Sequence, residues 1–199
     1  SDGYMDNSDY DMYNVAWQTR LLLNKENKVD FLLGYSDKKY GANTFYSAAY
    51  PNQYEKTSTY TGTVKGEFGS KLKFIPIAYW TRHHDQYELV RNTNFGANTH
   101  RADTYGGNLI LSYKSILGTT SISAELRKDE IMSTKLGELM AKPHRRYLKY
   151  DSRTNTSAGA EHSVKLDKVL LEAGLLINHN SLQDGKYSFL PSASASYSP

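Results

Sequence analysis

Apolar and polar residues alternate along much of this chain, and the alternation is clearest between residues 104 and 128. In two successive segments every second residue is apolar, aromatic or glycine, while the residues between them are mostly small or polar. The first set is Tyr105, Gly107, Leu109, Leu111 and Tyr113, followed in the second segment by Ile122, Ala124 and Leu126. A period of two indicates β-strands, and the short connection over residues 115–118 predicts an antiparallel hairpin.

The same alternation predicts further strands over residues 13–23, 29–35, 57–68, 154–166, 169–177 and 187–197, and a long strand-like run over 71–89. Pro76 cannot donate a ladder hydrogen bond, so it predicts a bulge in that run and leaves the facing of its side chains open. Short connections alternate with long irregular stretches; the former lie at Asn24, Gly69, Ser115 and Asp167, and the latter begin at Ser36, Val90, Glu130 and Asn180.

Short turns at one rim and long loops at the other are typical of an up-and-down membrane barrel. We therefore expect an all-β fold: an antiparallel up-and-down meander of about eight strands, forming one partial domain of a transmembrane β-barrel over residues 1–199. The apolar stripes strengthen this expectation, because most of them carry no charge. A Lys or Arg that faces lipid at the bilayer midplane costs about 2–4 kcal/mol.

Two other classes of protein fit the same alternation. One is a complete small barrel of about eight strands with a structural or adhesive role. The other is a soluble β-sandwich that acts as a binding module, because a water-facing sheet also alternates.

Composition excludes several functions. The 24 Lys and Arg residues nearly balance 21 Asp and Glu, and no basic run is long enough to indicate a nucleic-acid partner. The absence of cysteine excludes disulfides and cysteine-based metal sites. No Ser/His/Asp spacing or paired carboxylates indicate catalysis, so we expect no enzyme, no catalytic residue and no cofactor.

Several segments resemble a known family. They are residues 34–46 (GYSDKKYGANTFY), 50–55 (YPNQYE), 79–89 (YWTRHHDQYEL), 105–109 (YGGNL) and 190–199 (LPSASASYSP). They are similar to the barrel of TonB-dependent outer-membrane receptors, in particular the cobalamin- and siderophore-receptor-like branch found in Bacteroidetes.

The resemblance implies a location in the Gram-negative outer membrane and uptake of a scarce nutrient, such as a siderophore or a cobalamin-like ligand. Such receptors have a barrel of about 22 strands with a plugged lumen. The implied partners are outer-membrane lipid, the plug domain of the same full-length chain, the inner-membrane protein TonB, and a small-molecule or metal-chelate ligand. The resemblance further implies an internal barrel fragment, with the plug, the TonB-contacting box and the closing strands outside it.

An aromatic and amide-rich stretch is the main candidate for ligand binding. It comprises Tyr40, Asn43, Phe45, Tyr46, Tyr50 and Tyr54, and we add His83 and Asp85 from the HHD motif. Tyrosine and asparagine side chains grip bulky ligands by stacking and hydrogen bonding. The alternative is a loop that packs on itself or on its neighbour.

Other polar clusters give weaker signals. Adjacent residues of a strand point to opposite faces, so His83 and His84 do not converge on one metal ion, and we expect no metal site there. Three acidic residues near the N-terminus are either ligands in a calcium-binding loop or solvent-exposed side chains of a loop that binds no ion; they are Asp6, Asp9 and Asp11.

Two further groups have predicted contacts. The basic run over residues 142–146 either steers an anionic ligand, contacts lipopolysaccharide phosphates or is merely solvated. Glu125, Arg127 and Glu172 lie opposite the apolar stripes, and we expect them to face the lumen and contact a plug.

Overall fold

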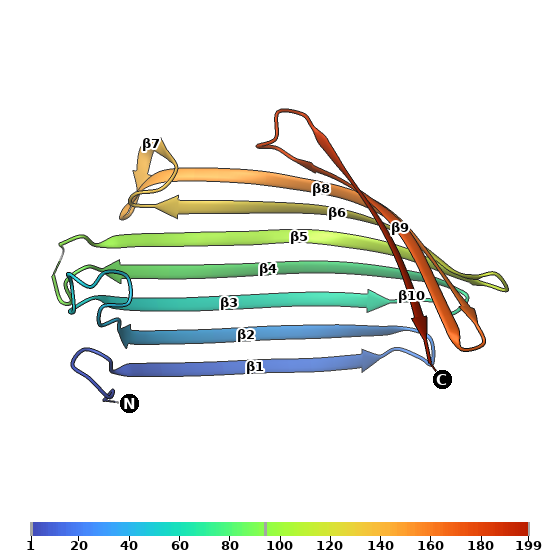
Figure 1. The fold of residues 1–199 in the computed structure, drawn as a ribbon, viewed down its shortest axis with the longest axis horizontal. Helices are drawn as coiled ribbons and strands as arrows, with labels where there is room; N and C mark the ends of the chain where they lie inside the picture. The colour runs from blue at the N-terminus through green and yellow to red at the C-terminus, as the bar shows by residue number, and fades with distance from the viewer. Residues whose placement is uncertain (1, 94, 199) are drawn as a thin grey trace.

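The computed structural model describes residues 2–93 and 95–198, which form one antiparallel sheet (Figure 1). Its strands are β1 (Tyr10–Leu22), β2 (Lys28–Gly41), β3 (Tyr54–Glu67), β4 (Leu72–Glu88), β5 (Asn98–Ser115), β6 (Gly118–Ser133), β7 (Glu138–His144), β8 (Tyr147–Leu166), β9 (Val169–Asn180) and β10 (Tyr187–Tyr197). Strands β1 to β6 and β8 to β10 follow chain order, and β7 pairs only with β8. The predicted antiparallel meander is confirmed, with ten strands in the described residues.

The strands extend further than the alternation predicts. Strand β2 continues to Gly41, β5 begins at Asn98, and β7 lies inside the stretch expected to be an irregular loop. Ladder hydrogen bonds join backbones whatever the side chains are. Where both faces of a strand are polar, the ladder continues although the alternation has stopped, so the predicted loops were too long.

The alternation of short turns and long loops is confirmed. In Figure 1 the β1–β2, β3–β4, β5–β6 and β8–β9 turns lie at the right, opposite the β2–β3 and β4–β5 loops. Gly69 in the β3–β4 turn has a φ of 90°, and a Cβ there would lie 2.2 Å from the carbonyl oxygen of Leu72. Only glycine therefore fits this turn without strain.

Pro76 causes no bulge, so that prediction was wrong. The β4–β5 register runs through Pro76 without a shift, pairing it with Leu109. On the other side, Lys65 pairs with Ile77 and Phe68 bridges Phe74 in the same register. Pro76 lacks a donor toward β3, so two residue pairs are missing from the β3–β4 ladder before it resumes in the same register.

The strand register sorts the side chains onto two faces. The apolar face is the one that carries Trp17, Leu33, Val64, Trp80, Leu109, Ile122, Leu126, Leu175 and Phe189, all of them exposed. Among the described residues only Ala42 and Tyr147 are buried hydrophobics. No second sheet packs on this face within that part of the chain, so the fold is not a β-sandwich.

Aromatic side chains form a row across the apolar face on the side of the long loops. The rings of Tyr35 and Tyr60 lie 4.9 Å apart on β2 and β3. Trp80 and Tyr105 are direct cross-strand partners on β4 and β5. Toward the short turns, Tyr113 on β5 borders the same face, with the Lys71 ammonium 5.5 Å from its ring centre.

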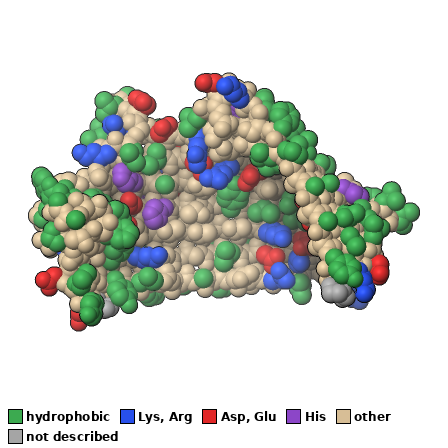
Figure 2. Space-filling model, viewed as in Figure 1, with side chains coloured by type: hydrophobic (Ala, Val, Ile, Leu, Met, Phe, Trp, Pro, Cys, Tyr) green, Lys and Arg blue, Asp and Glu red, His purple; other side chains and the backbone are tan. Residues whose placement is uncertain are grey.

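The sheet is curved, and the opposite, polar face lies on its concave side, called the inside of the curl below. In Figure 1, β9 and β10 pass in front of the sheet, and Figure 2 shows from the same side a surface with few hydrophobic side chains over its middle. Gly106 leaves room for the Tyr79 hydroxyl, which crosses β5 and donates to Glu125 Oε1 at 2.6 Å. Register also places Arg127 and Glu172 on this face.

Candidate ligand-binding site

Three strands bring phenol and carboxylate groups together on the polar face near the long loops. Tyr40 on β2 is the cross-strand partner of Glu55 on β3, which in turn pairs with Tyr87 on β4. The loop residue Tyr46 covers this row: its hydroxyl donates to Glu55 Oε2, and its ring meets Tyr87 edge-on at 5.2 Å. The row presents aromatic rings around one carboxylate.

The rows below add imidazole and hydroxyl groups. Asp85 on β4 is the cross-strand partner of His100 on β5, whose Nδ1 lies 2.8 Å from Ser133 Oγ. His83 Nδ1 lies at the same distance, 2.8 Å, from Thr59 Oγ1. Asp85 Oδ1 is buried and has no hydrogen-bond partner among the described residues. A buried carboxylate oxygen without a partner is costly, so a donor group that reached this atom would stabilise the site.

Gln53 organises the loop over residues 42–53. Its side chain is fully buried; Oε1 accepts from the Tyr46 amide, and Nε2 donates to the carbonyls of Ser47 at 2.9 Å and Tyr50 at 2.8 Å. The Gln53 carbonyl also accepts from the amide of Ala42 at 2.8 Å. This packing fixes where Tyr46 lies. The role of Gln53 was not predicted, because no residue pattern around it indicates that a glutamine is buried.

The same loop is tied to the N-terminal segment and to the β4–β5 loop. Asn43 Nδ2 donates to the carbonyl of Asp6 at 2.7 Å. Arg91 donates to both carboxylate oxygens of Asp9, at 2.5 and 2.9 Å, and lies 4.5 Å from the ring centre of Tyr54. The Arg91 guanidinium holds the pKa of Asp9 below its ordinary value of 3.8.

The structure brings together part of the predicted site. Tyr40, Tyr46, His83 and Asp85 lie on or over the polar face, although all but Tyr46 belong to strands and not to loops.

The other predicted residues lie elsewhere. The side chains of Phe45 and Tyr50 are in the loop and exposed; Tyr50 meets Phe95 at 6.5 Å. Tyr54 belongs to the other face by register, and Asn43 holds the loop in place.

The expectation that His83 and His84 face apart is confirmed. His83 contacts Thr59 on the polar face, whereas the ring of His84 meets Tyr60 on the apolar face at 6.4 Å. No group of three His, Asp or Glu residues in the described part of the chain is arranged to hold a metal ion. Of the N-terminal acids, Asp9 gives both oxygens to Arg91 and is not free to ligate calcium.

Three members of the candidate site were not predicted from the sequence: Glu55, Tyr87 and His100. Each of them lies an even number of residues from other polar-face residues of its own strand, so the alternation is consistent with its face. The alternation does not tell which residues of two neighbouring strands are paired. Alignment depends on the lengths of the loops that join the strands, which the alternation pattern overestimated.

No protein-family model matches the sequence, and no curated protein matches it. Solved structures do match its fold. The siderophore receptor PirA from Pseudomonas aeruginosa is 12% identical with a TM-score of 0.65, and the match covers 96% of this chain and 31% of that chain. The siderophore receptor PirA from Acinetobacter baumannii is 17% identical with a TM-score of 0.66, covering 96% of this chain and 32% of that chain.

The meander is folded like part of a β-barrel receptor. This chain spans about a third of the length of the receptors that it matches. Both of them are receptors and not enzymes. Separately, the described residues contain no helix with the length and apolar character needed to cross a membrane.

Replacing Gln53 with alanine should loosen the loop over residues 42–53 while the sheet stays folded. The substitution leaves backbone groups of the loop without partners, at a cost of about 2 kcal/mol. The open fraction then rises roughly thirtyfold, measured as the rate of chymotrypsin cleavage after Phe45 or Tyr46. Gln18→Ala on β1, where the side chain is exposed, is the control; similar cleavage rates for both variants would contradict this role of Gln53.

The Asp9–Arg91 ion pair should release the N-terminal segment only in acid. The pKa of Asp9 is lower in the folded state than its ordinary value of 3.8. The ion pair therefore stabilises fully above pH 3.8, and this stabilisation disappears as the pH falls through the pKa of the folded state. Pepsin should therefore cleave residues 4–9 slowly at about pH 4 and faster toward about pH 2 after correction for its own pH profile. Asp9→Asn should abolish this rise in cleavage rate on acidification. A rise that survives in that variant would show that another group is responsible.

Proposed function

We propose that this chain forms part of the wall of an outer-membrane receptor barrel that takes up a scarce siderophore- or cobalamin-like ligand with energy from TonB. The observation that carries the proposal is the exposed apolar face, backed by a polar face on the inside of the curl. Water does not tolerate so large a continuous apolar surface on one sheet, whereas lipid requires it.

The dimensions of the apolar face support a bilayer. From Tyr105 to Tyr113 on β5 the strand rises about 27 Å, which a tilt of about 40° reduces to about 20 Å in height. The bordering aromatic rings extend this toward the ~25 Å apolar band of outer-membrane barrels. The polar face would line the lumen, where Glu125, Arg127 and Glu172 would meet a plug domain.

Ligand binding is proposed at the polar face below the long loops. Tyr40, Tyr46 and Tyr87 supply rings for stacking and hydroxyls for hydrogen bonds around Glu55. One row deeper lies Asp85 Oδ1, which has no hydrogen-bond partner in the described part of the chain. The exposed rings of Phe45 and Tyr50 at the loop would make the first contact with a bulky ligand.

Fractionation of source cells tests location. An antibody raised against this chain should detect an outer-membrane protein about three times as large, given that the chain covers 31% of a matching receptor. A band in the soluble fraction would overturn the proposal.

Uptake of labelled compounds tests transport. Cells in which the gene is disrupted should lose energy-dependent uptake of one member of a panel of ⁵⁵Fe-loaded siderophores and labelled cobalamin. Tyr46→Phe, which removes the hydroxyl on Glu55, should weaken binding of that compound about tenfold. Tyr113→Phe, at the far end of the apolar face, is the control and should bind normally; unchanged uptake of the whole panel after gene disruption would contradict the proposal.

A further inference from the structure

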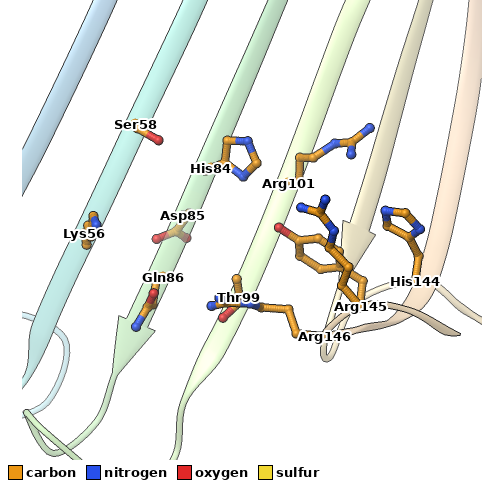
Figure 3. A pocket seen from close by; sticks show the side chains of 11 residues that line it. Lys56, Ser58, His84, Asp85, Gln86, Thr99, Arg101, His144, Arg145 and Arg146 are labelled. Carbon is orange, nitrogen blue, oxygen red and sulfur yellow. The ribbon is translucent and has the colours of Figure 1, made fainter.

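A basic cavity opens on the apolar face, beyond its aromatic row and toward the long loops. It has a volume of about 280 Å³ and is lined from β3, β4 and β5 by Lys56, His84 and Arg101. The end of β7 and the turn that follows close another side with His144, Arg145 and Arg146, and the two arginine side chains reach toward β5 in Figure 3. The ligand-binding site proposed above lies on the other face of the same strands.

The charges of this cavity are not balanced by the protein. Arg101 donates to Asp103 Oδ2 at 2.7 Å, which leaves its terminal nitrogens for another acceptor. Lys56, Arg145 and Arg146 make no ion pair within the described part of the chain. The lining carboxylate, Asp85, belongs to the polar face by register.

Cross-strand pairing places like charges directly opposite one another here. Lys39 on β2 pairs with Lys56 on β3. Such pairs destabilise a sheet unless an anion lies between or above them. Arg145 adds to this cost, since its φ of 56° is a turn conformation that glycine and asparagine adopt more readily.

The position of the cavity relative to the apolar face identifies the class of anion. His84 meets the ring of Tyr60 at 6.4 Å, and the guanidinium of Arg82 lies 5.4 Å from the Trp80 ring centre. The basic groups therefore begin where the aromatic row ends. An anion that carries acyl chains would place them along Val64 and Leu109 while its charge enters the cavity.

We propose that this cavity binds the phosphate groups of a phosphorylated lipid of the outer leaflet, with its acyl chains lying against the apolar face. Arginine suits this task because its guanidinium forms two parallel hydrogen bonds to a phosphate. The inference rests on the outer-membrane location proposed above and adds a lipid site whose lining shares only Asp85 with the proposed ligand-binding site.

Titration of the detergent-purified protein tests this site. The probes are diphosphoryl lipid A, the same lipid after enzymatic removal of its phosphates, and inorganic phosphate, with binding followed by native mass spectrometry. We expect diphosphoryl lipid A to bind at least about tenfold more tightly than the phosphate-free lipid. Inorganic phosphate at millimolar concentration should compete poorly, because it gains nothing from the apolar face.

The test variant is the double substitution Arg145→Asn/Arg146→Gln. Asparagine accepts the left-handed φ of residue 145, so the turn should remain folded while two charges are lost. Affinity for diphosphoryl lipid A should fall about tenfold or more. Lys142→Gln, a neighbouring exposed lysine of β7 that does not line the cavity, should leave it unchanged.

Three results would overturn the inference. They are equal binding of the phosphate-free lipid, full competition by inorganic phosphate, and unchanged affinity in the double variant. Each is measured on purified protein and does not depend on transport. A failure here with normal location and uptake would therefore remove the lipid site alone, whereas a protein found in the soluble fraction would remove the proposed function.

Discussion

Placing an arginine at Ala124 should lower the free energy of unfolding by about 2–4 kcal/mol and impair membrane assembly. Ala124 lies on the apolar face of β6, flanked on the same face by Ile122 and Leu126 and paired with Leu109 and Ala158. In the proposed orientation the guanidinium would face lipid near the bilayer midplane, where it has neither water nor a partner. The measurement is urea unfolding of the protein reconstituted in phospholipid vesicles.

The adjacent residue of β6 provides a matched control. Ser123 points to the polar face and lines a cavity of about 420 Å³, so an arginine there has room and polar neighbours. Ser123→Arg should change the free energy of unfolding by less than about 1 kcal/mol. Equal effects of the two substitutions would mean that both faces meet the same solvent, which would contradict a lipid-facing wall.

Removing the carboxylate of Asp103 should cost about 2–3 kcal/mol of folding free energy, the second large effect. Asp103 is only 4% exposed and accepts hydrogen bonds from Arg82 Nε at 2.6 Å and Arg101 Nε at 2.7 Å. Asp103→Ala leaves two guanidinium groups side by side without their shared acceptor. Both arginines are partly exposed, which keeps the cost below that of a fully buried pair.

A surface ion pair on the same face is the control for this substitution. Asp37 lies 3.7 Å from Lys39, whose side chain is 41% exposed, so Asp37→Ala should cost less than about 1 kcal/mol. Both variants are compared by urea unfolding in the same vesicles. If the two cost the same, Asp103 does not hold the arginines in the way its hydrogen bonds indicate.

The accuracy of the sequence-based interpretation differs along each strand. Between Tyr105 and Tyr113 one face is apolar and the other polar, and there the predicted strand and its facing are correct. On the N-terminal side of Tyr105, Arg101 and Asp103 lie on the same face as Leu109. There the polarity of a residue no longer indicates which face of the sheet its side chain occupies. The predicted irregular stretches are therefore partly strand.

The candidate site shows the same division. Tyr40, Tyr46, His83 and Asp85 were identified by residue type, and the structure places them at one end of the polar face. Tyr54, chosen for the same reason, belongs to the opposite face. Residue type indicates what a side chain can bind, but a shift of one residue along a strand moves it to the other side of the sheet.

The sequence by itself determined the strand class, the antiparallel turns and the apolar stripes, because these depend on a period of two and on local turn chemistry. Only the tertiary structure decided the register between strands, since loop lengths and long-range ladder hydrogen bonds fix it. Register is what places Glu55 between Tyr40 and Tyr87 on one face. It also places Lys56, His84 and Arg101 around one basic cavity on the other, although they are far apart in the sequence.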